Sequence, residues 1–127
     1  FFDLLFDGNK AWAQRAAALV LFISRTHFDK DNRPCVSHSY DTGAAWQSFA
    51  LQGYASGIAV HGILGFDQVR ARAELRIPAE FHIEAMAVVG RPTTPDVLSE
   101  AQQAREHPSD RRPVSESVCE GAFAFGG

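Results

Sequence analysis

The sequence predicts an α+β domain in which a mixed β-sheet carries helices on both faces. The continuous apolar run Ala18–Ile23 has the length of a strand and is rich in β-branched and aromatic residues. Apolar and polar positions alternate along Phe81–Val89, which indicates another strand. Between them, the uncharged stretch Thr42–Phe66 predicts a long helix to about Ser56 and then a strand over Ile58–Ile63. Three strands are few for a doubly wound sheet, so the mixed sheet is the better prediction.

Length and composition predict one globular domain spanning residues 1–127. The chain is 46% hydrophobic and 21% charged, which excludes a disordered or fibrous protein. Its net charge of −3 provides no basic field for nucleic acid, and its longest uncharged run is too polar to span a membrane. Cys35 and Cys119 form no disulfide framework, which fits a reducing, cytoplasmic compartment.

The first residues predict a helix over Phe1–Asp7 that presents phenylalanines to the outside. Gly8 breaks this helix, and Asn9 caps a second one that continues to Arg15. A domain rarely begins with exposed phenylalanines, so we expect a further segment before Phe1, or a second subunit, to cover them.

The central helix is expected to begin at a cap on Asp41 or Thr42 and to end at a left-handed Gly57. Only a narrow stripe of its surface is polar, so the helix is expected to be covered nearly all round, as a central or subunit-interface helix.

The remaining elements follow from caps and prolines. Asp67 is expected to cap a helix over 68–75, Pro95 to start a helix to about Glu106, and Pro113 to open a last turn. In the third strand, one face is expected to carry Ile83, Ala85, Ala87 and Val89, and the other His82, Glu84, Met86 and Val88. No element is assigned to the Gly- and Phe-rich residues 121–127.

The turn after the second strand is the first candidate ligand site. It comprises Gly62, Ile63, Leu64 and Gly65, whose bare backbone could face a flat aromatic ligand at the carboxyl end of a buried strand. The alternative is a tight turn that needs glycine only for its backbone dihedral angles.

Arg111 and Arg112 form the second candidate, because two guanidinium groups before a helix start could clamp a phosphate. The alternative is a solvated pair of surface charges.

Three further interpretations remain open. His27, Cys35 and His38 could bind a metal, although the spacing is irregular for zinc, and a polar loop describes them better. His61 could donate a proton or be a buried structural histidine, and Glu84 is expected on an outer face rather than as a general base.

Several short motifs, taken in order, resemble the FMN-dependent nitroreductase family. The motifs are Asn9–Ala13 before the first strand, Asp41–Ala45 opening the long helix, Gly57 at its end, Gly65–Asp67 after the second strand, Gly90–Pro92 after the third, and Asp110–Val114. Together they cover almost the whole chain.

The resemblance implies an α/β/α sandwich with a mixed, largely antiparallel sheet, forming an obligate homodimer with FMN at the subunit interface. Members transfer a hydride from NADH or NADPH to flavin N5 and reduce nitroaromatics, quinones or similar acceptors, so no catalytic side chain and no metal are expected. The backbone around Ile63–Gly65 would face the flavin, and Arg111 or Arg112 would contact the phosphate.

Members of the family also begin with an arginine- and serine-containing segment that binds the phosphate, and later contribute an asparagine-containing loop that reaches the flavin. Neither is found in this sequence, so we expect an N-terminally incomplete domain, and a non-catalytic flavin-binding or dimerisation module is the alternative.

Overall fold

The computed structural model describes residues 1–122, so residues 123–127 of the Gly- and Phe-rich end lie outside the described part. The described residues fall into two compact units: unit 1, Phe1–Thr93, and unit 2, which begins at Thr94. In unit 1 the elements are η1 (Phe2–Leu4), α1 (Asp7–Ala13), β1 (Ala18–Arg25), α2 (His38–Ala55), β2 (Ala59–Ile63), α3 (Gln68–Glu74) and β3 (Phe81–Gly90).

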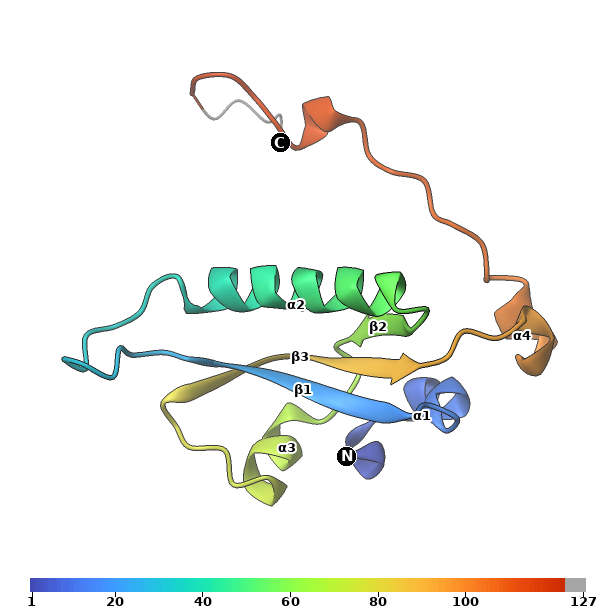
Figure 1. Ribbon diagram of the computed structural model, residues 1–127, viewed down its shortest axis with the longest axis horizontal. Coiled ribbons are helices and arrows are strands. Elements are labelled where there is room, and N and C mark those ends of the chain that lie inside the picture. The colour runs from blue at the N-terminus through green and yellow to red at the C-terminus, as the bar shows by residue number, and fades with distance from the viewer. Residues whose placement is uncertain (123–127) are drawn as a thin grey trace. The chain divides into compact units, whose positions relative to one another are not determined.

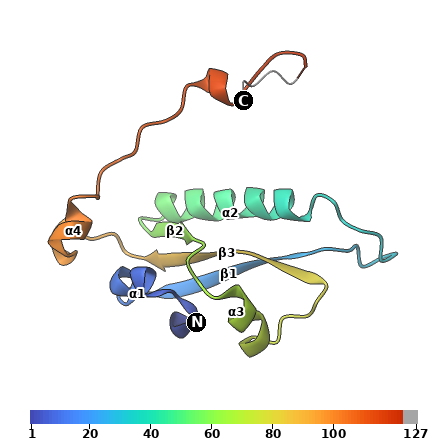
Figure 2. The same cartoon turned by 180° about the vertical axis from the view of Figure 1, so that it is seen from behind.

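The three strands of unit 1 form one antiparallel sheet in the order β1-β3-β2. Helix α2 lies along one face of this sheet, and α1 and α3 lie on the other face (Figures 1 and 2). The predicted α+β class, with a largely antiparallel sheet between helices, is confirmed.

Strand β3 contains a β-bulge at Glu84. Phe22 of β1 pairs with Ala85, but the next residue, Ile23, pairs with Ile83, so Glu84 has no partner on β1. The extra residue reverses the alternation of side chains, and Ile83 therefore joins Met86 and Val88 in the core. The uninterrupted alternation predicted for this strand was wrong at Glu84, because a period of two cannot pass through a bulge.

The hydrophobic core lies on the face covered by η1, α1 and α3. Its members are buried apolar side chains: Leu4, Leu5, Ala13, Ile63, Phe66, Ala71, Ile83, Met86 and Val88. Helix α2 contributes none of them.

Helix α2 is uncovered on its outer side, although the sequence predicted a helix buried nearly all round. None of its residues is buried, and Tyr40, Leu51 and Tyr54 are 81%, 59% and 84% exposed. On the side of the sheet, Phe49 meets Phe22 edge to face with ring centroids 5.7 Å apart, and Trp46 lies against Gly62 of β2.

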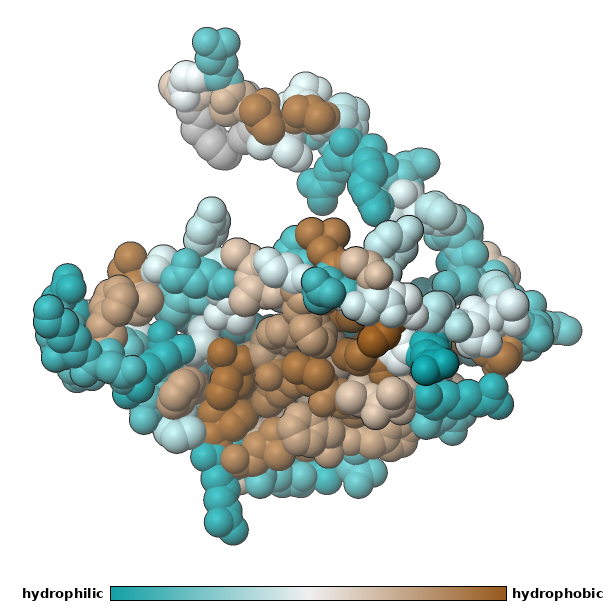
Figure 3. Space-filling view, in the orientation of Figure 1, coloured by the Kyte–Doolittle hydropathy of each residue, from teal (hydrophilic) through white to brown (hydrophobic). Residues whose placement is uncertain are grey.

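Strand β1 is also less buried than predicted. It is an edge strand, and of its eight residues only Ser24 is buried. Figure 3 shows apolar side chains gathered on this side of unit 1, over β1. The continuous apolar run correctly predicted a strand but not one buried on both faces.

Three predicted helix signals are confirmed. Gly57 has a φ of +69°, the left-handed geometry that ends a helix. The Asp67 carboxylate accepts a hydrogen bond from the Arg70 N–H at 2.9 Å and caps α3. Pro113 precedes the turn η3 (Val114–Glu116) in unit 2.

Three predicted helix boundaries were wrong. The helix predicted over residues 1–7 is only the short turn η1, because Leu5 is extended and pairs with Phe66, and Asp7 already belongs to α1. Helix α1 already includes Gly8 and Asn9, so Asn9 is not its cap. Helix α2 begins at His38, which places Asp41 in its first turn, where a carboxylate is favoured by the helix dipole.

Unit 2 contains η2 (Pro95–Val97), α4 (Glu100–Gln103) and η3. The single helix predicted over 95–106 is interrupted, because Leu98 is extended and Ser99 starts a new helix through a capping box with Gln102. In the described part of the chain, no helix is long and apolar enough to cross a membrane.

Candidate cofactor site

The turn Gly62–Gly65 connects the end of β2 to the segment before α3. Ile63 is 6% exposed and its side chain belongs to the core, whereas the Leu64 side chain is 69% exposed. Among residues 1–122, the backbone N–H groups of Leu64 and Gly65 donate no hydrogen bond. The turn therefore has two backbone donors that are unpaired among the described residues.

Both glycines of this turn lie at close contacts within the chain. Neither has a positive φ, so the alternative based on dihedral angles alone was wrong. A Cβ on Gly62 would lie 2.8 Å from Cζ2 of Trp46 in α2, and a Cβ on Gly65 would collide with the amide of Asn9 in α1. The glycines let two helices approach the turn from opposite faces of the sheet.

Arg111 and Arg112 lie in an exposed loop of unit 2, before η3. One guanidinium N–H group of Arg111 donates to the backbone oxygen of Ser109 at 3.1 Å and to its hydroxyl at 3.0 Å. Arg112 is exposed. Arg111 and Arg112 belong to unit 2 and the turn Gly62–Gly65 belongs to unit 1. The predicted phosphate contact and the predicted flavin contact therefore stay separate predictions.

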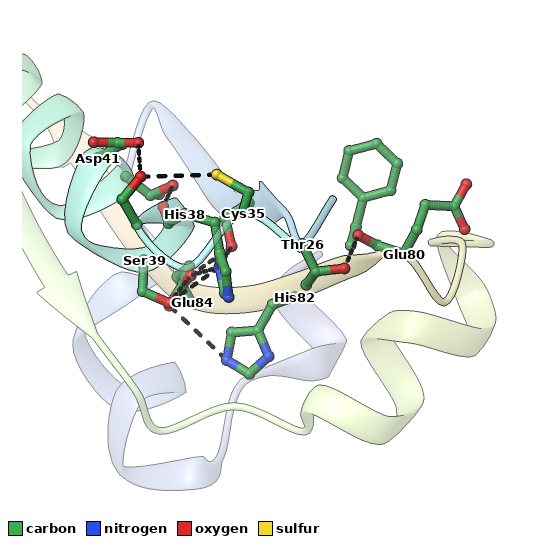
Figure 4. Close-up of polar contacts among 12 residues, drawn as sticks. Thr26, Cys35, His38, Ser39, Asp41, Glu80, His82 and Glu84 are labelled. Atoms are coloured by element: carbon green, nitrogen blue, oxygen red, sulfur yellow. Dashed lines mark hydrogen bonds and ion pairs between the residues drawn. The ribbon is translucent and has the colours of Figure 1, made fainter. Parts of the chain in front are cut away.

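A polar cluster that the sequence did not predict lies where the bulge in β3 meets the end of β1 and the first turn of α2 (Figure 4). Glu84 Oε1 accepts hydrogen bonds from the hydroxyls of Ser24 at 2.5 Å and Ser39 at 2.7 Å. His38 Nδ1 lies 2.7 Å from the Ser24 hydroxyl and 3.4 Å from Glu84 Oε1, and His82 Nε2 lies 3.9 Å from Oε2. The expectation that Glu84 lies on an outer face was wrong.

The cluster stabilises the ionised form of Glu84. Burial opposes ionisation, but hydrogen bonds from Ser24 and Ser39, with the nearby His82 and His38, lower the pKa of Glu84 below its ordinary value. The Ser24 hydroxyl is turned toward the carboxylate, so the group does not have the serine–histidine–carboxylate order of a hydrolase. We infer that the cluster fixes α2 to the sheet.

We expect the Glu84→Gln variant to lose part of the acid sensitivity of the protein. A carboxylate whose pKa is lowered by folding stabilises the native state above its ordinary pKa, and this contribution is lost as the pH falls through the folded pKa. The free energy of unfolding of the wild type should therefore fall more steeply on acidification than that of the variant. Urea unfolding at a series of acidic pH values measures both slopes, with the exposed Glu106→Gln as control. Equal slopes for wild type and Glu84→Gln would contradict this role.

The metal interpretation of the loop finds no support in its geometry. Thr26 Oγ1 lies 2.9 Å from His27 Nδ1, Cys35 Sγ lies 3.8 Å from the Ser37 hydroxyl, and His38 joins the Glu84 cluster. Within residues 1–122, no group of three or more His, Cys, Asp or Glu side chains could hold a metal ion.

His61 is exposed, so the interpretation as a buried histidine was wrong. It packs edge to face against Trp12 with ring centroids 4.9 Å apart.

An open hollow of about 500 Å³ lies along α1 and the start of β1. It is lined by Phe1, Phe2, Ala13, Gln14, Ala16, Ala17, Ala18 and Leu19.

Comparison with solved structures identifies the fold. The chain is similar to an oxidoreductase that contains FMN, with a TM-score of 0.91 and 36% sequence identity over 98% of this chain and 65% of that one. It also matches nitroreductase-family proteins from Streptococcus pneumoniae TIGR4 (TM-score 0.67, 18% identity, 94% of this chain and 72% of that one) and Clostridium difficile 630 (0.58, 18%, 86% and 62%).

The chain spans about two thirds of the length of these proteins, and the two nitroreductase-family matches show the fold alone. No protein-family model and no curated protein matches the sequence. The chain therefore has the nitroreductase fold, and the resemblance to the nitroreductase family that its sequence predicts is confirmed by the solved structures.

Proposed function

We propose that the protein is an FMN-dependent oxidoreductase that takes a hydride from NADH or NADPH and reduces nitroaromatics, quinones or similar acceptors in the cytoplasm. The observation that carries the proposal is the match to an FMN-containing oxidoreductase over 98% of this chain at 36% identity. A similarity of this extent includes the turn at the end of β2 as well as the strands that hold it.

The residues of the turn fit a flavin. The free N–H groups of Leu64 and Gly65 are donors, and the edge of an isoalloxazine ring carries carbonyl oxygens and a ring nitrogen that accept hydrogen bonds. The exposed Leu64 side chain provides apolar contact, and Gly62 and Ile63 hold the turn through the sheet and the core. Bound FMN would carry the electrons, and these residues would orient it.

The arginines of unit 2 fit the phosphate of FMN. A guanidinium group binds phosphate through paired N–H donors, and Arg111 and Arg112 are both exposed. We propose that one of these two residues contacts the phosphate.

A homodimer accounts for the uncovered side of α2. Tyr40, Leu51 and Tyr54 are largely exposed on this helix, and an exposed apolar face of this kind marks a surface for association. A second copy packed against α2 would bury it.

The proposal is tested with the purified full chain. After addition of FMN, we expect the protein to retain the yellow cofactor through gel filtration, to elute as a dimer, and to oxidise NADPH or NADH when a quinone or nitroaromatic compound is present. A protein that stays colourless in excess FMN would overturn the proposal. Bound FMN that neither NADH nor NADPH reduces would instead favour a non-catalytic flavin-binding module.

A further inference from the structure

The carbonyl oxygen of Gly65 accepts two hydrogen bonds from the N-terminal part of the chain. The backbone N–H of Phe6 donates to it at 3.0 Å, and the side-chain amide of Asn9 donates to it at 3.0 Å. A carbonyl oxygen has two lone pairs, so this one is fully used. Asn9 and Gly65 are 56 residues apart in the sequence, and the contact ties α1 to the proposed flavin-facing turn.

These hydrogen bonds determine the direction of the Gly65 N–H group, which is a free donor of the turn. The peptide unit between Gly65 and Phe66 is planar, and its N–H donates to the Leu64 oxygen at 2.9 Å. That bond in turn orients the preceding peptide unit, whose own N–H is the free donor of Gly65. Because N–H and C=O point in opposite directions across a trans peptide, holding the Gly65 carbonyl sets the orientation of both units.

The residue types at positions 9 and 65 are explained by their contact with each other, not by the secondary structure in which each lies. Asparagine is a poor helix former, yet Asn9 lies inside α1 and does not cap it. Gly65 has no positive φ, yet a Cβ there would collide with the Asn9 amide. Each residue is explained by the hydrogen bond between them.

We propose that Asn9 is a positioning residue that aims the backbone N–H of Gly65 at the flavin. The proposal rests on the proposed function, because it concerns the same turn. Asn9 acts through the Gly65 carbonyl and does not itself touch the cofactor.

The test compares FMN binding by the full chain with Asn9 intact, in Asn9→Ala and in Asn9→Asp. Exposed Gln14→Ala, at the end of the same helix, is the matched control. The readouts are the dissociation constant for FMN from flavin fluorescence, the midpoint potential of the bound flavin, and the thermal unfolding of each apo protein.

For Asn9→Ala we expect the dissociation constant to rise about three- to tenfold, the effect of one neutral hydrogen bond, with a shifted flavin potential. For Asn9→Asp we expect a larger rise near neutral pH, because the carboxylate repels the Gly65 carbonyl. The defect should diminish as the pH is lowered toward about 5, where a carboxyl group in this environment begins to be protonated and can donate again. Gln14→Ala should bind FMN as the wild type does.

Two results separate the failure of this proposal from the failure of the proposed function. If the wild type binds FMN and both Asn9 variants show wild-type affinity, potential and pH profile, Asn9 is a structural residue and the positioning role is overturned, even if their thermal unfolding is altered. If the wild type itself binds no FMN, the proposed function fails and this inference fails with it.

Discussion

Replacement of Phe66 by alanine is expected to lower the free energy of unfolding by about 3–5 kcal/mol, the cost of removing a fully packed aromatic side chain. Phe66 is 2% exposed, belongs to the core cluster, and pairs through its backbone with Leu5. Its ring thus fixes the segment between β2 and α3 onto the α1 side of the sheet. Urea-induced unfolding of the two proteins measures the difference.

The control for Phe66→Ala is Leu64→Ala, two residues earlier in the same segment. Leu64 is 69% exposed, so its truncation is expected to change the free energy of unfolding by less than about 0.5 kcal/mol. Under the proposed function, Leu64→Ala should nevertheless weaken FMN binding, because this side chain lies on the open side of the turn. Equal stability losses in the two variants would contradict the assignment of Phe66 as the anchor.

The Gly62→Ala substitution is expected to cost about 1–3 kcal/mol of stability, the usual range for overpacking. The new Cβ would lie 2.8 Å from Cζ2, 3.3 Å from Cε2 and 3.4 Å from Nε1 of Trp46. An indole ring cannot move aside as the end of a flexible side chain can, so α2 must shift away from the sheet. Thermal or urea unfolding, with tryptophan fluorescence as the probe, follows both the loss and the displacement of Trp46.

Gly43→Ala is the matched control for Gly62→Ala. Gly43 lies within α2, and a Cβ there would meet no atom within 4 Å. Alanine in a helix interior is favoured over glycine by roughly 0.5–1 kcal/mol, so this variant is expected to be more stable than the wild type. A Gly62→Ala protein as stable as Gly43→Ala would show that the contact with Trp46 does not constrain position 62.

The candidate site was predictable in part from local sequence. An apolar strand followed by a glycine-containing turn predicted Gly62–Gly65, and this turn lies at the end of β2 with two N–H groups that make no hydrogen bond among residues 1–122. The reason for its glycines was not predictable, because Trp46 and Asn9 approach from helices that lie elsewhere in the sequence. The local sequence predicts Asn9 as a helix cap, because asparagine after glycine is typical of a helix start, whereas the hydrogen bond to the Gly65 oxygen depends on a contact 56 residues away.

The polar cluster around Glu84 was not predictable either, because its members lie far apart in the sequence. The sequence singled out His38 and Glu84 separately, but nothing local connects Glu84 to the hydroxyls of Ser24 and Ser39, or His38 to that of Ser24. The bulge that turns the Glu84 side chain toward these hydroxyls depends on the register between β1 and β3.

What the sequence by itself determined is the set of elements whose signals lie within a few residues: the three strands, the left-handed end at Gly57, the cap at Asp67 and the fold class. Hydrophobic periodicity and capping are local effects, so the order of residues is enough to reveal them. The tertiary structure alone decided the bulge at Glu84, the uncovered side of α2 and the hold of Asn9 on Gly65. Each of these depends on a contact between residues far apart in the chain, and the geometry of such a contact exists only after the sheet has assembled.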